Sequence, residues 1–463
     1  MKYISRDDTI VALSTPMGSG AIAVVRLSGA QSLDILNPLL KRAITPEHAR
    51  QAVFNELRGT ENGASLDQVV TTFFQSPKSY TGEDLVEISC HCNPLIINRI
   101  ISEIVRRGAR IADPGEFTFR AFLNGKMDLS QAEAVSEIIS ARSRQSVSQS
   151  LRHLEGRLSE KIHEIKTDIL NHLALLEINL DFSDEEIEVM PVAEMSAKMR
   201  QVIGQIESLL NTYDYGRLLQ EGVKLLILGK PNVGKSSLLN QLLQRDRAIV
   251  SDIPGTTRDY IEATMELDGL AVQAVDTAGI RKTEDKIEAI GVQRAMEHIQ
   301  TADVALCIFD GHTGLDADDR VLLDIIRDHG EAVNIVLALN KSDLPENSQT
   351  RTTLEKLNFP LVQISAKTGA GAAALKHALK QVLISDTSME SEEIVVTSAR
   401  HKNVLERTIT ALQNAIEAIE MHATEEIISV DIRLALDCLG EITGETTPDD
   451  VINHIFANFC IGK

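Results

Sequence analysis

The chain has 463 residues, a formal net charge of −21 and an apolar fraction of 43%. This length predicts two to four domains, and the ordinary composition excludes global disorder. The charge disfavours loose, non-specific binding to nucleic acid, and neither an apolar run of about 18 residues nor a signal-peptide core occurs. The five cysteines are scattered and odd in number, so we expect no disulfide framework and a cytoplasmic location.

Residues 1–120 are expected to form an α+β domain. Short apolar or alternating runs, bounded by Gly, Pro and Asn, predict strands at residues 21–29, 68–74 and 85–91. Asn93 followed by Pro94 predicts an N-cap and the first residue of a helix, which Gly108 is expected to end.

The next segment, residues 121–215, has the pattern of helices. Apolar residues from Val147 to Leu176 recur at steps of three and four, which predicts one long amphipathic helix. The acidic stretch 181–191 ends it, and a second helical run extends to about Tyr215. We interpret the apolar stripe as the core of a helical bundle, with an open coiled coil to a partner as the alternative.

Residues 216–384 alternate between strand and helix patterns, which predicts an α/β domain with a doubly wound parallel sheet. Its expected strands are residues 223–229, 271–276, 303–310, 333–340 and 361–365. Helices return in residues 385–463, where Thr447 and Pro448 predict the start of the last helix. The simplest architecture is a discontinuous helical domain with the α/β domain inserted between its halves.

The stretch GKPNVGKSS, residues 229–237, fits the phosphate-loop pattern between a predicted strand and a predicted helix. Gly229 and Gly234 let the backbone approach phosphate. Lys235 can bridge the β- and γ-phosphates, and the Ser236 hydroxyl can bind Mg²⁺. The candidate nucleotide contacts here are Gly229, Asn232, Val233, Gly234, Lys235, Ser236 and Ser237.

Three later motifs complete a guanine-nucleotide site. The Asp276 carboxylate can hold Mg²⁺ through water, and the Asp343 carboxylate can accept two N–H bonds from a guanine edge, which adenine does not offer. The order and spacing resemble those of translation-factor-like GTPases, so GTP is the expected nucleotide and a Ras-like G domain is the expected fold. The candidate contacts are Asp276, Thr277, Ala278, Gly279, Asn340, Lys341, Asp343, Ser365, Ala366 and Lys367.

The catalytic arrangement differs from that of many GTPases, because Ile280 stands where a Gln usually orients the attacking water. The side-chain oxygen of Asn232 suits a monovalent cation, and residues 251–259 can supply carbonyls and a hydroxyl that senses Mg²⁺. This pattern resembles GTPases that are activated by K⁺ and by dimerisation, in which K⁺ replaces an arginine finger. A loop-stabilising role for Asn232 is the alternative. The stretch adds Ser251, Asp252, Ile253, Pro254, Gly255, Thr256 and Thr257 to the candidate site.

Several stretches together resemble the MnmE/TrmE family, GTPases that modify the wobble uridine of tRNA. They are DTIVALSTPMGSGAIAVVRLSG, SYTGEDLVEISCH, DPGEFTFRAFLNGKMDLSQAEAV, the inserted G domain and the final CIGK. The resemblance implies a homodimer joined through its N-terminal domains and a flavoprotein partner of the MnmG/GidA type, which together form a heterotetramer. This complex would add an aminomethyl or carboxymethylaminomethyl group at C5 of uridine 34.

The resemblance also implies further site residues. The N-terminal domain resembles tetrahydrofolate-binding enzymes, so 5-formyl- or methylene-tetrahydrofolate would supply the carbon, in contact with Arg26, Glu87, Lys126 and Lys463. K⁺ would be bound by Asn232 and the carbonyls of Ser251, Ile253 and Thr256, and Mg²⁺ by Ser236 and Thr257. The resemblance implies that Glu288 positions the attacking water. The candidate catalytic residues are Glu288, Lys235 from the phosphate loop, and Cys460.

The ending CIGK does not fit a prenylation signal, because Gly462 and Lys463 are not the usual residues there. We interpret it as part of an active site, and whether the Cys460 thiol reacts or only packs stays open. Cys92 and Asn93 replace two glycines of the family pattern, and the short Cys90-to-Cys92 spacing does not predict a metal site.

Two other functions are compatible with a GTPase. A binding switch in ribosome assembly or signalling would be favoured by a basic RNA-binding appendage, but the segment after the G domain is helical and acidic. A K⁺-stimulated GTPase without a modification role would leave the N-terminal motifs and CIGK unexplained.

Overall fold

The chain forms two compact units, which we describe separately. Our computed structural model describes residues 8–18, 20–59, 63–181, 192–245, 263–275, 299–330, 333–384 and 394–462. The first unit comprises residues 1–136, 152–206 and 403–463, and the second comprises residues 137–151 and 207–402. Within the described ranges, no helix has the length and apolar character needed to span a bilayer.

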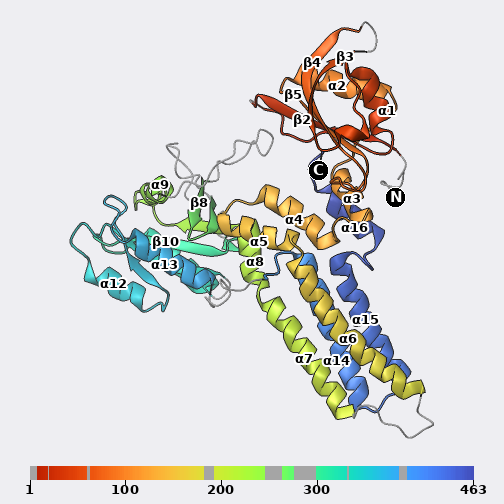
Figure 1. Cartoon of the computed structure of the whole chain (residues 1–463). Coiled ribbons are helices and arrows are strands. Elements are labelled where there is room, and N and C mark those ends of the chain that lie inside the picture. Colours follow the sequence, from red (N-terminus) through yellow and green to blue (C-terminus); the bar gives the residue numbers. More distant parts are fainter. Residues whose placement is uncertain are drawn as a thin grey trace. The chain divides into compact units, whose positions relative to one another are not determined.

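A six-stranded sheet of order β3-β4-β5-β2-β1-β6 forms the N-terminal part of the first unit (Figure 1). All neighbours are antiparallel except β1 and β6. The strands are β1 (Ile10–Leu13), β2 (Ile22–Ser28), β3 (Ala52–Arg58), β4 (Ser65–Phe74), β5 (Leu85–His91) and β6 (Arg110–Ile111). The three predicted strands are therefore confirmed as β2, the second half of β4, and β5.

Side-chain alternation gives this sheet two different faces. Val25, Ile88 and their neighbours on one face pack in a core against α1 (Ser32–Leu36) and α2 (Pro94–Arg106). Two short 3₁₀ helices, η1 (Asn37–Leu39) and η2 (Pro46–His48), lie between α1 and β3. The other face carries Arg26 and Glu87, which are register partners on β2 and β5.

Helix α2 confirms the predicted start signal. The Asn93 side chain accepts the N–H of Leu95 at 2.9 Å, and Pro94 is the first helical residue. Asn93 has φ of −123°, so the turn where the family has glycine needs no residue with positive φ here.

The prediction of one helix through the apolar stripe is wrong. The structure has α5 (Arg144–Leu154) and α6 (Arg157–Asp181), separated at Gly156, which has φ of +90°. Val147 and Leu151 on α5 are 36% and 44% exposed, whereas the stripe residues of α6 are buried. Because a left-handed residue interrupts the helix, the two parts of the stripe do not share one buried face.

The first unit also contains a bundle of long helices (Figure 1). It contains α6, α7 (Val192–Asn211), α14 (Ala399–Glu420) and α15 (Glu425–Thr443), so it combines segments from both sides of the second unit in sequence. Ion pairs join α7 to α14 through Arg200 and Glu420, and α14 to α15 through Arg407 and Glu441. The stripe residues of α6 form bundle core, as interpreted from the sequence.

Three further helices flank the bundle segments in sequence. They are α3 (Glu116–Leu123), α4 (Leu129–Ser140) and α16 (Asp449–Ala457). The last begins one residue later than predicted, with Pro448 as its N-cap. The Thr447 hydroxyl donates to the Glu441 carbonyl at 2.8 Å instead of capping α16.

The second unit contains a six-stranded sheet of order β12-β11-β10-β7-β9-β8. Its strands are β7 (Val223–Leu228), β8 (Ala263–Leu267), β9 (Leu270–Val275), β10 (Val304–Asp310), β11 (Asn334–Asn340) and β12 (Leu361–Gln363). The sheet is parallel except at its edge, where β8 is antiparallel to β9 and was not predicted.

Helices cover both faces of this sheet, which confirms the predicted doubly wound α/β class. One core contains α9 (Lys235–Arg245) and α13 (Ala372–Leu383), and the other contains α11 (Ala317–His329) and α12 (Ser348–Glu355). The first core also includes Val395 and α8 (Tyr213–Glu221), a helix absent from the sequence prediction.

Candidate functional site

The phosphate loop connects the end of β7 to the start of α9. Lys235 is the first residue of α9, and its ammonium donates to the carbonyls of Gly229 at 2.5 Å and Lys230 at 2.9 Å. The Lys235 ammonium is therefore held over the loop between strand and helix, where the helix N-terminus favours an anion. Ser236 follows in the first turn of α9.

Asn232 lies in the middle of this loop with φ of +59°. Its side chain is exposed, while the next residue, Val233, is buried. Asparagine tolerates this left-handed conformation better than most residues, which gives a structural reason for its presence. The exposed amide oxygen is also a suitable ligand for a monovalent cation.

The residues predicted to bind guanine are held by hydrogen bonds, one of which reaches the phosphate loop. Asn340, at the end of β11, donates from Nδ2 to the Val233 carbonyl at 2.7 Å and accepts the N–H of Ala366 at 2.9 Å. Ser365 donates to Asp343 Oδ1 at 2.6 Å, and this bond lowers the pKa of the Asp343 carboxyl below its usual value. Asp343 is exposed and stays ionised at neutral pH, as an acceptor of guanine N–H groups must be.

Lys341 has a partner that the sequence did not indicate. Its ammonium donates at 2.6 Å to Asp310, the last residue of β10. Burial opposes ionisation of Asp310, but the bonds from Lys341 and two backbone N–H groups outweigh it, so the pKa of Asp310 is lowered. Lys367, also assigned to the site, is exposed beside Ala366.

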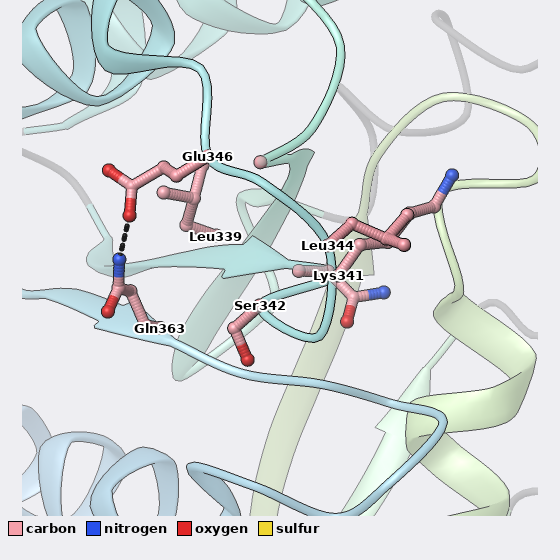
Figure 2. A pocket seen from close by; sticks show the side chains of 8 residues that line it. Leu339, Lys341, Ser342, Leu344, Glu346 and Gln363 are labelled. Carbon is pink, nitrogen blue, oxygen red and sulfur yellow. Dashed lines mark hydrogen bonds between the residues drawn. The ribbon is translucent and has the colours of Figure 1, made fainter.

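A cavity of about 110 Å³ adjoins this motif (Figure 2). It is lined by residues of the Asn340–Leu344 segment and by Glu346 and Gln363, whose side chains are hydrogen-bonded to each other. Asn340 and Lys341 line this cavity, whereas Asp343 and Ser365 do not, so it only partly coincides with the predicted guanine contacts.

Sequence reasoning missed Lys230, the second residue of the phosphate loop. Its ammonium donates to Asp316 at 2.7 Å and to Asp319 at 2.8 Å, at the N-terminus of α11. These bonds attach the phosphate loop to the N-cap and first turn of α11. The motif fixes only the residue types at its ends, so it gave no signal for this variable position.

Other predicted nucleotide and ion contacts lie outside the described residues. They are Ser251, Asp252, Ile253, Pro254, Gly255, Thr256, Thr257, Asp276, Thr277, Ala278, Gly279 and Glu288. Lys463, assigned to folate, is also outside them.

The structure brings together the predicted folate contacts of the N-terminal sheet. Arg26 donates from Nε to Glu87 Oε1 at 2.9 Å, and its guanidinium lies 5.3 Å from the ring centroid of Tyr80. A carboxylate and an aromatic face therefore hold one guanidinium from two sides. Lys126 lies against the same loop as Tyr80, because its ammonium donates to the Pro77 carbonyl at 3.1 Å.

The C-terminal segment lies against the first strand of this sheet. The Gly115 N–H donates to the Cys460 carbonyl at 3.4 Å, and Gly462 lies against Leu13 and Ser14. Leu13 follows Ala12, the register partner of Arg26 on β1. Phe456 and Phe459 anchor this segment in an apolar cluster, while the Cys460 side chain is exposed.

Cys90 and Cys92 occupy different environments. Burial raises the pKa of the Cys90 thiol to about 11, so it is protonated at neutral pH and a poor ligand. His91 points to the other side of the strand, where its Nδ1 lies 2.7 Å from Asp67. Among the residues that the structure describes, no group of three His, Cys, Asp or Glu side chains could hold a metal ion.

The doubly wound sheet, the phosphate loop and the Asn340–Asp343 motif define a GTPase of the phosphate-loop class. Two family models match the chain: the GTP-binding protein TrmE N-terminus over residues 9–126 and the MnmE helical domain over residues 129–460. The chain therefore belongs to the MnmE/TrmE family, as its sequence motifs indicated.

Full-length relatives agree with this assignment. A tRNA modification GTPase MnmE from Moorella thermoacetica is 43% identical, over 99% of this chain and 100% of the relative. Proteins of the same name from Syntrophus aciditrophicus and Carboxydothermus hydrogenoformans are each 39% identical, over 98% and 99% of this chain and 99% and 100% of the relatives.

Proposed function

We propose that this protein is a K⁺-activated GTPase that, with a flavoprotein partner, modifies C5 of the wobble uridine of tRNA with a folate-derived carbon. The observation that carries the proposal is identity of about 40% along the whole chain to proteins named tRNA modification GTPase MnmE. The product would be an aminomethyl or carboxymethylaminomethyl uridine. The free cysteines support action in a reducing cytoplasm.

GTP binding rests on the residues joined through Asn340. Its side chain bonds both Val233 in the phosphate loop and Ala366 beside the base site. The segments that would bind phosphate and guanine are therefore held together by one residue. Lys235 would stabilise charge on the β- and γ-phosphates, and the Ser236 hydroxyl would bind Mg²⁺. Asp343 would accept the guanine N–H groups.

The K⁺ requirement rests on Asn232 and on Ile280. An isoleucine cannot orient the attacking water, so another group must stabilise the transition-state charge. The exposed amide of Asn232 fits a cation ligand beside the phosphates. We assign the other K⁺ ligands to the carbonyls of Ser251, Ile253 and Thr256, a further Mg²⁺ hydroxyl to Thr257, and the positioning of water to Glu288.

Folate binding rests on the polar patch of the N-terminal sheet. Glu87 and Arg26 offer an acceptor and a donor side by side, which suits the mixed donor and acceptor edge of a pterin. Lys126 and Lys463 would pair with the carboxylates of the folate tail. Cys460 is exposed at the end of the anchored C-terminal segment, so its thiol is accessible for chemistry there.

Homodimerisation and the flavoprotein partner follow from the family. The sheet face that carries Arg26 also exposes Ile22, Phe54 and Val70, which are 65%, 63% and 37% exposed. Apolar side chains of this size on one face support burial against a second copy. The partner and the tRNA would complete the modification site.

GTP turnover tests the cation argument. We expect turnover to be on the order of tenfold or more faster in K⁺ than in Na⁺ at equal ionic strength, because K⁺ takes the part of an arginine finger. Asn232→Ala should remove most of this difference. Steady-state hydrolysis in the two salts measures both effects.

Asn358→Ala is the matched control, because Asn358 is also exposed and has φ of +58°, in the turn after α12. It reproduces the loss of an asparagine from a left-handed position without touching the phosphate loop. Equal rates in both salts for the wild type would refute K⁺ activation. A K⁺ response retained by Asn232→Ala would refute the role of Asn232.

A further inference from the structure

The loop between β4 and β5, residues 75–84, borders the patch that we assign to folate. Its Tyr80 ring lies under the Arg26 guanidinium, and its Pro77 carbonyl accepts from Lys126. Two of the proposed folate contacts therefore rest on this one loop. The position of the loop therefore contributes to the positions of these two cations, while Glu87 on β5 also holds Arg26.

Hydrogen bonds between its own residues hold the 75–84 loop together. The N–H of Ser76 donates to Asp84 Oδ1 at 2.8 Å, across the base of the loop. The Ser79 hydroxyl donates to the Glu83 carbonyl at 2.5 Å. One bond joins the two ends of the loop, and the other ties Ser79, next to Tyr80, to Glu83. We therefore expect a displacement of Glu83 to move Tyr80.

Helix α3 and its C-cap hold this loop at three points. The Thr118 hydroxyl lies 2.9 Å from the Tyr80 hydroxyl, and Asn124 Nδ2 donates to the Thr81 carbonyl at 2.7 Å. Arg120 donates to both carboxylate oxygens of Glu83, at 3.1 and 3.2 Å. Thr118 and Arg120 lie within α3 and Asn124 is its C-cap, so one short segment makes all three contacts.

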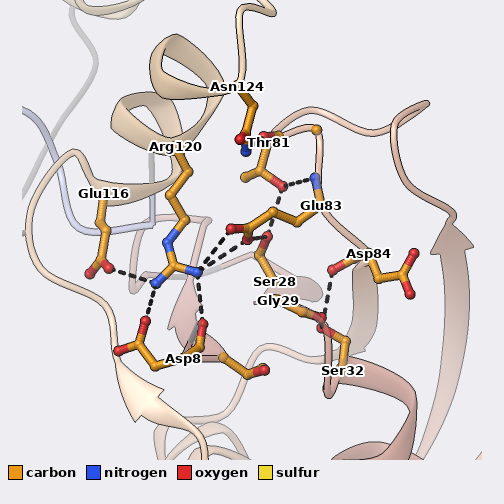
Figure 3. Close-up of polar contacts among 12 residues, drawn as sticks. Asp8, Ser28, Gly29, Ser32, Thr81, Glu83, Asp84, Glu116, Arg120 and Asn124 are labelled. Atoms are coloured by element: carbon orange, nitrogen blue, oxygen red, sulfur yellow. Dashed lines mark hydrogen bonds and ion pairs between the residues drawn. The ribbon is translucent and has the colours of Figure 1, made fainter. Parts of the chain in front are cut away.

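The Arg120 contact is part of a buried charge network (Figure 3). Its side chain is 6% exposed and also pairs with Asp8 at 2.6 Å and with Glu116 at 3.0 Å. On the loop side, Ser28 donates to Glu83 Oε2 at 2.9 Å. Arg120 is thus fixed on several sides, and Glu83 is held to α3 by Arg120 and to β2 by Ser28.

We propose that α3 is the positioning element of the folate site: Thr118 and Arg120 hold the 75–84 loop so that Tyr80 supports Arg26 in its binding position. Neither residue is assigned to contact the ligand. Thr118 acts through the Tyr80 hydroxyl, and Arg120 acts through Glu83. The inference rests on the proposed folate function and adds to it the residues that set the geometry.

Binding of 5-formyltetrahydrofolate to the full chain tests this, measured by calorimetry. Thr118→Val keeps the side-chain shape but removes the bond to Tyr80, so we expect affinity to fall about three- to tenfold. Thr118→Ser retains a hydroxyl and should stay within about twofold of wild type. GTP hydrolysis should not change in either variant, because Thr118 lies in the other unit from the phosphate loop.

A double-mutant cycle separates positioning from general structural damage. Tyr80→Phe removes the same bond from the loop side, so Thr118→Val/Tyr80→Phe should lose no more affinity than either single variant. Arg120→Lys, which keeps the charge but not the forked geometry, should weaken folate binding about tenfold or more while GTP turnover is unchanged.

Wild-type affinity retained by Thr118→Val, or fully additive losses in the double variant, would overturn the inference. The variant Arg26→Gln distinguishes failure of the proposed role of α3 from failure of the proposed folate site. If Arg26→Gln abolishes binding while Thr118→Val does not change it, the folate site stands and only the role of α3 is refuted. If the wild type does not bind, or Arg26→Gln binds as the wild type does, the folate assignment fails and this inference fails with it.

Discussion

Gly234→Ala is expected to weaken GTP binding by about 100-fold or more. Gly234 has φ of +107°, which L-residues rarely adopt. A Cβ atom there would also lie 2.2 Å from Asn340 Nδ2. Movement of Asn340 would break hydrogen bonds, because its side chain is buried and bonded to both Val233 and Ala366.

The substitution therefore breaks the connection between the phosphate loop and the base site, not only the loop itself. Titration with a fluorescent GTP analogue measures the loss. Gly314→Ala is the control in the same unit, since its Cβ would meet only Asn347 Nδ2, at an ordinary 3.8 Å. Near-normal GTP affinity in Gly234→Ala would show that the loop binds phosphate in a conformation different from this one.

Gly462→Ala is expected to reduce tRNA modification by at least about tenfold and to leave GTP hydrolysis unchanged. Gly462 has φ of +92°, and a Cβ atom on it would lie 2.2 Å from the Leu13 carbonyl oxygen. Both the strain and the backbone clash push the segment away from β1. Cys460 would then be displaced from the strand that pairs with Arg26.

Gly204→Ala, in the bundle helix α7, is the control, because its Cβ would meet nothing within 4 Å. Modification of tRNA by the complete two-protein enzyme and GTP turnover by the chain alone are the two measurements. Normal modification in Gly462→Ala would contradict the role of this segment in the active site. Loss of GTP turnover as well would make the segment a structural element.

Local sequence signals predicted the structure where the determinants are close in the chain. The helix start at Asn93-Pro94, the strand of residues 85–91 and the phosphate loop all depend on a few neighbouring residues, and the structure has them. The break at Gly156 did not follow from periodicity, since the apolar spacing continues across it. There the left-handed backbone overrides the pattern.

Contacts between residues far apart in the chain could not be predicted from the sequence. Arg26 and Glu87 were each assigned by resemblance, but their ion pair depends on the register of β2 and β5, which neither stretch specifies alone. Thr118 and Arg120 lie within a quoted family stretch and were not singled out, because their partners are 38 and 37 residues away. The antiparallel edge strand β8 was missed next to a correctly predicted β9.

The most direct test of the proposed function is mass analysis of wobble nucleosides in tRNA from cells that lack this protein. We predict loss of the aminomethyl and carboxymethylaminomethyl uridines, restored by the wild-type chain and not by Gly234→Ala. Unchanged wobble nucleosides in cells without the protein would contradict the proposed function.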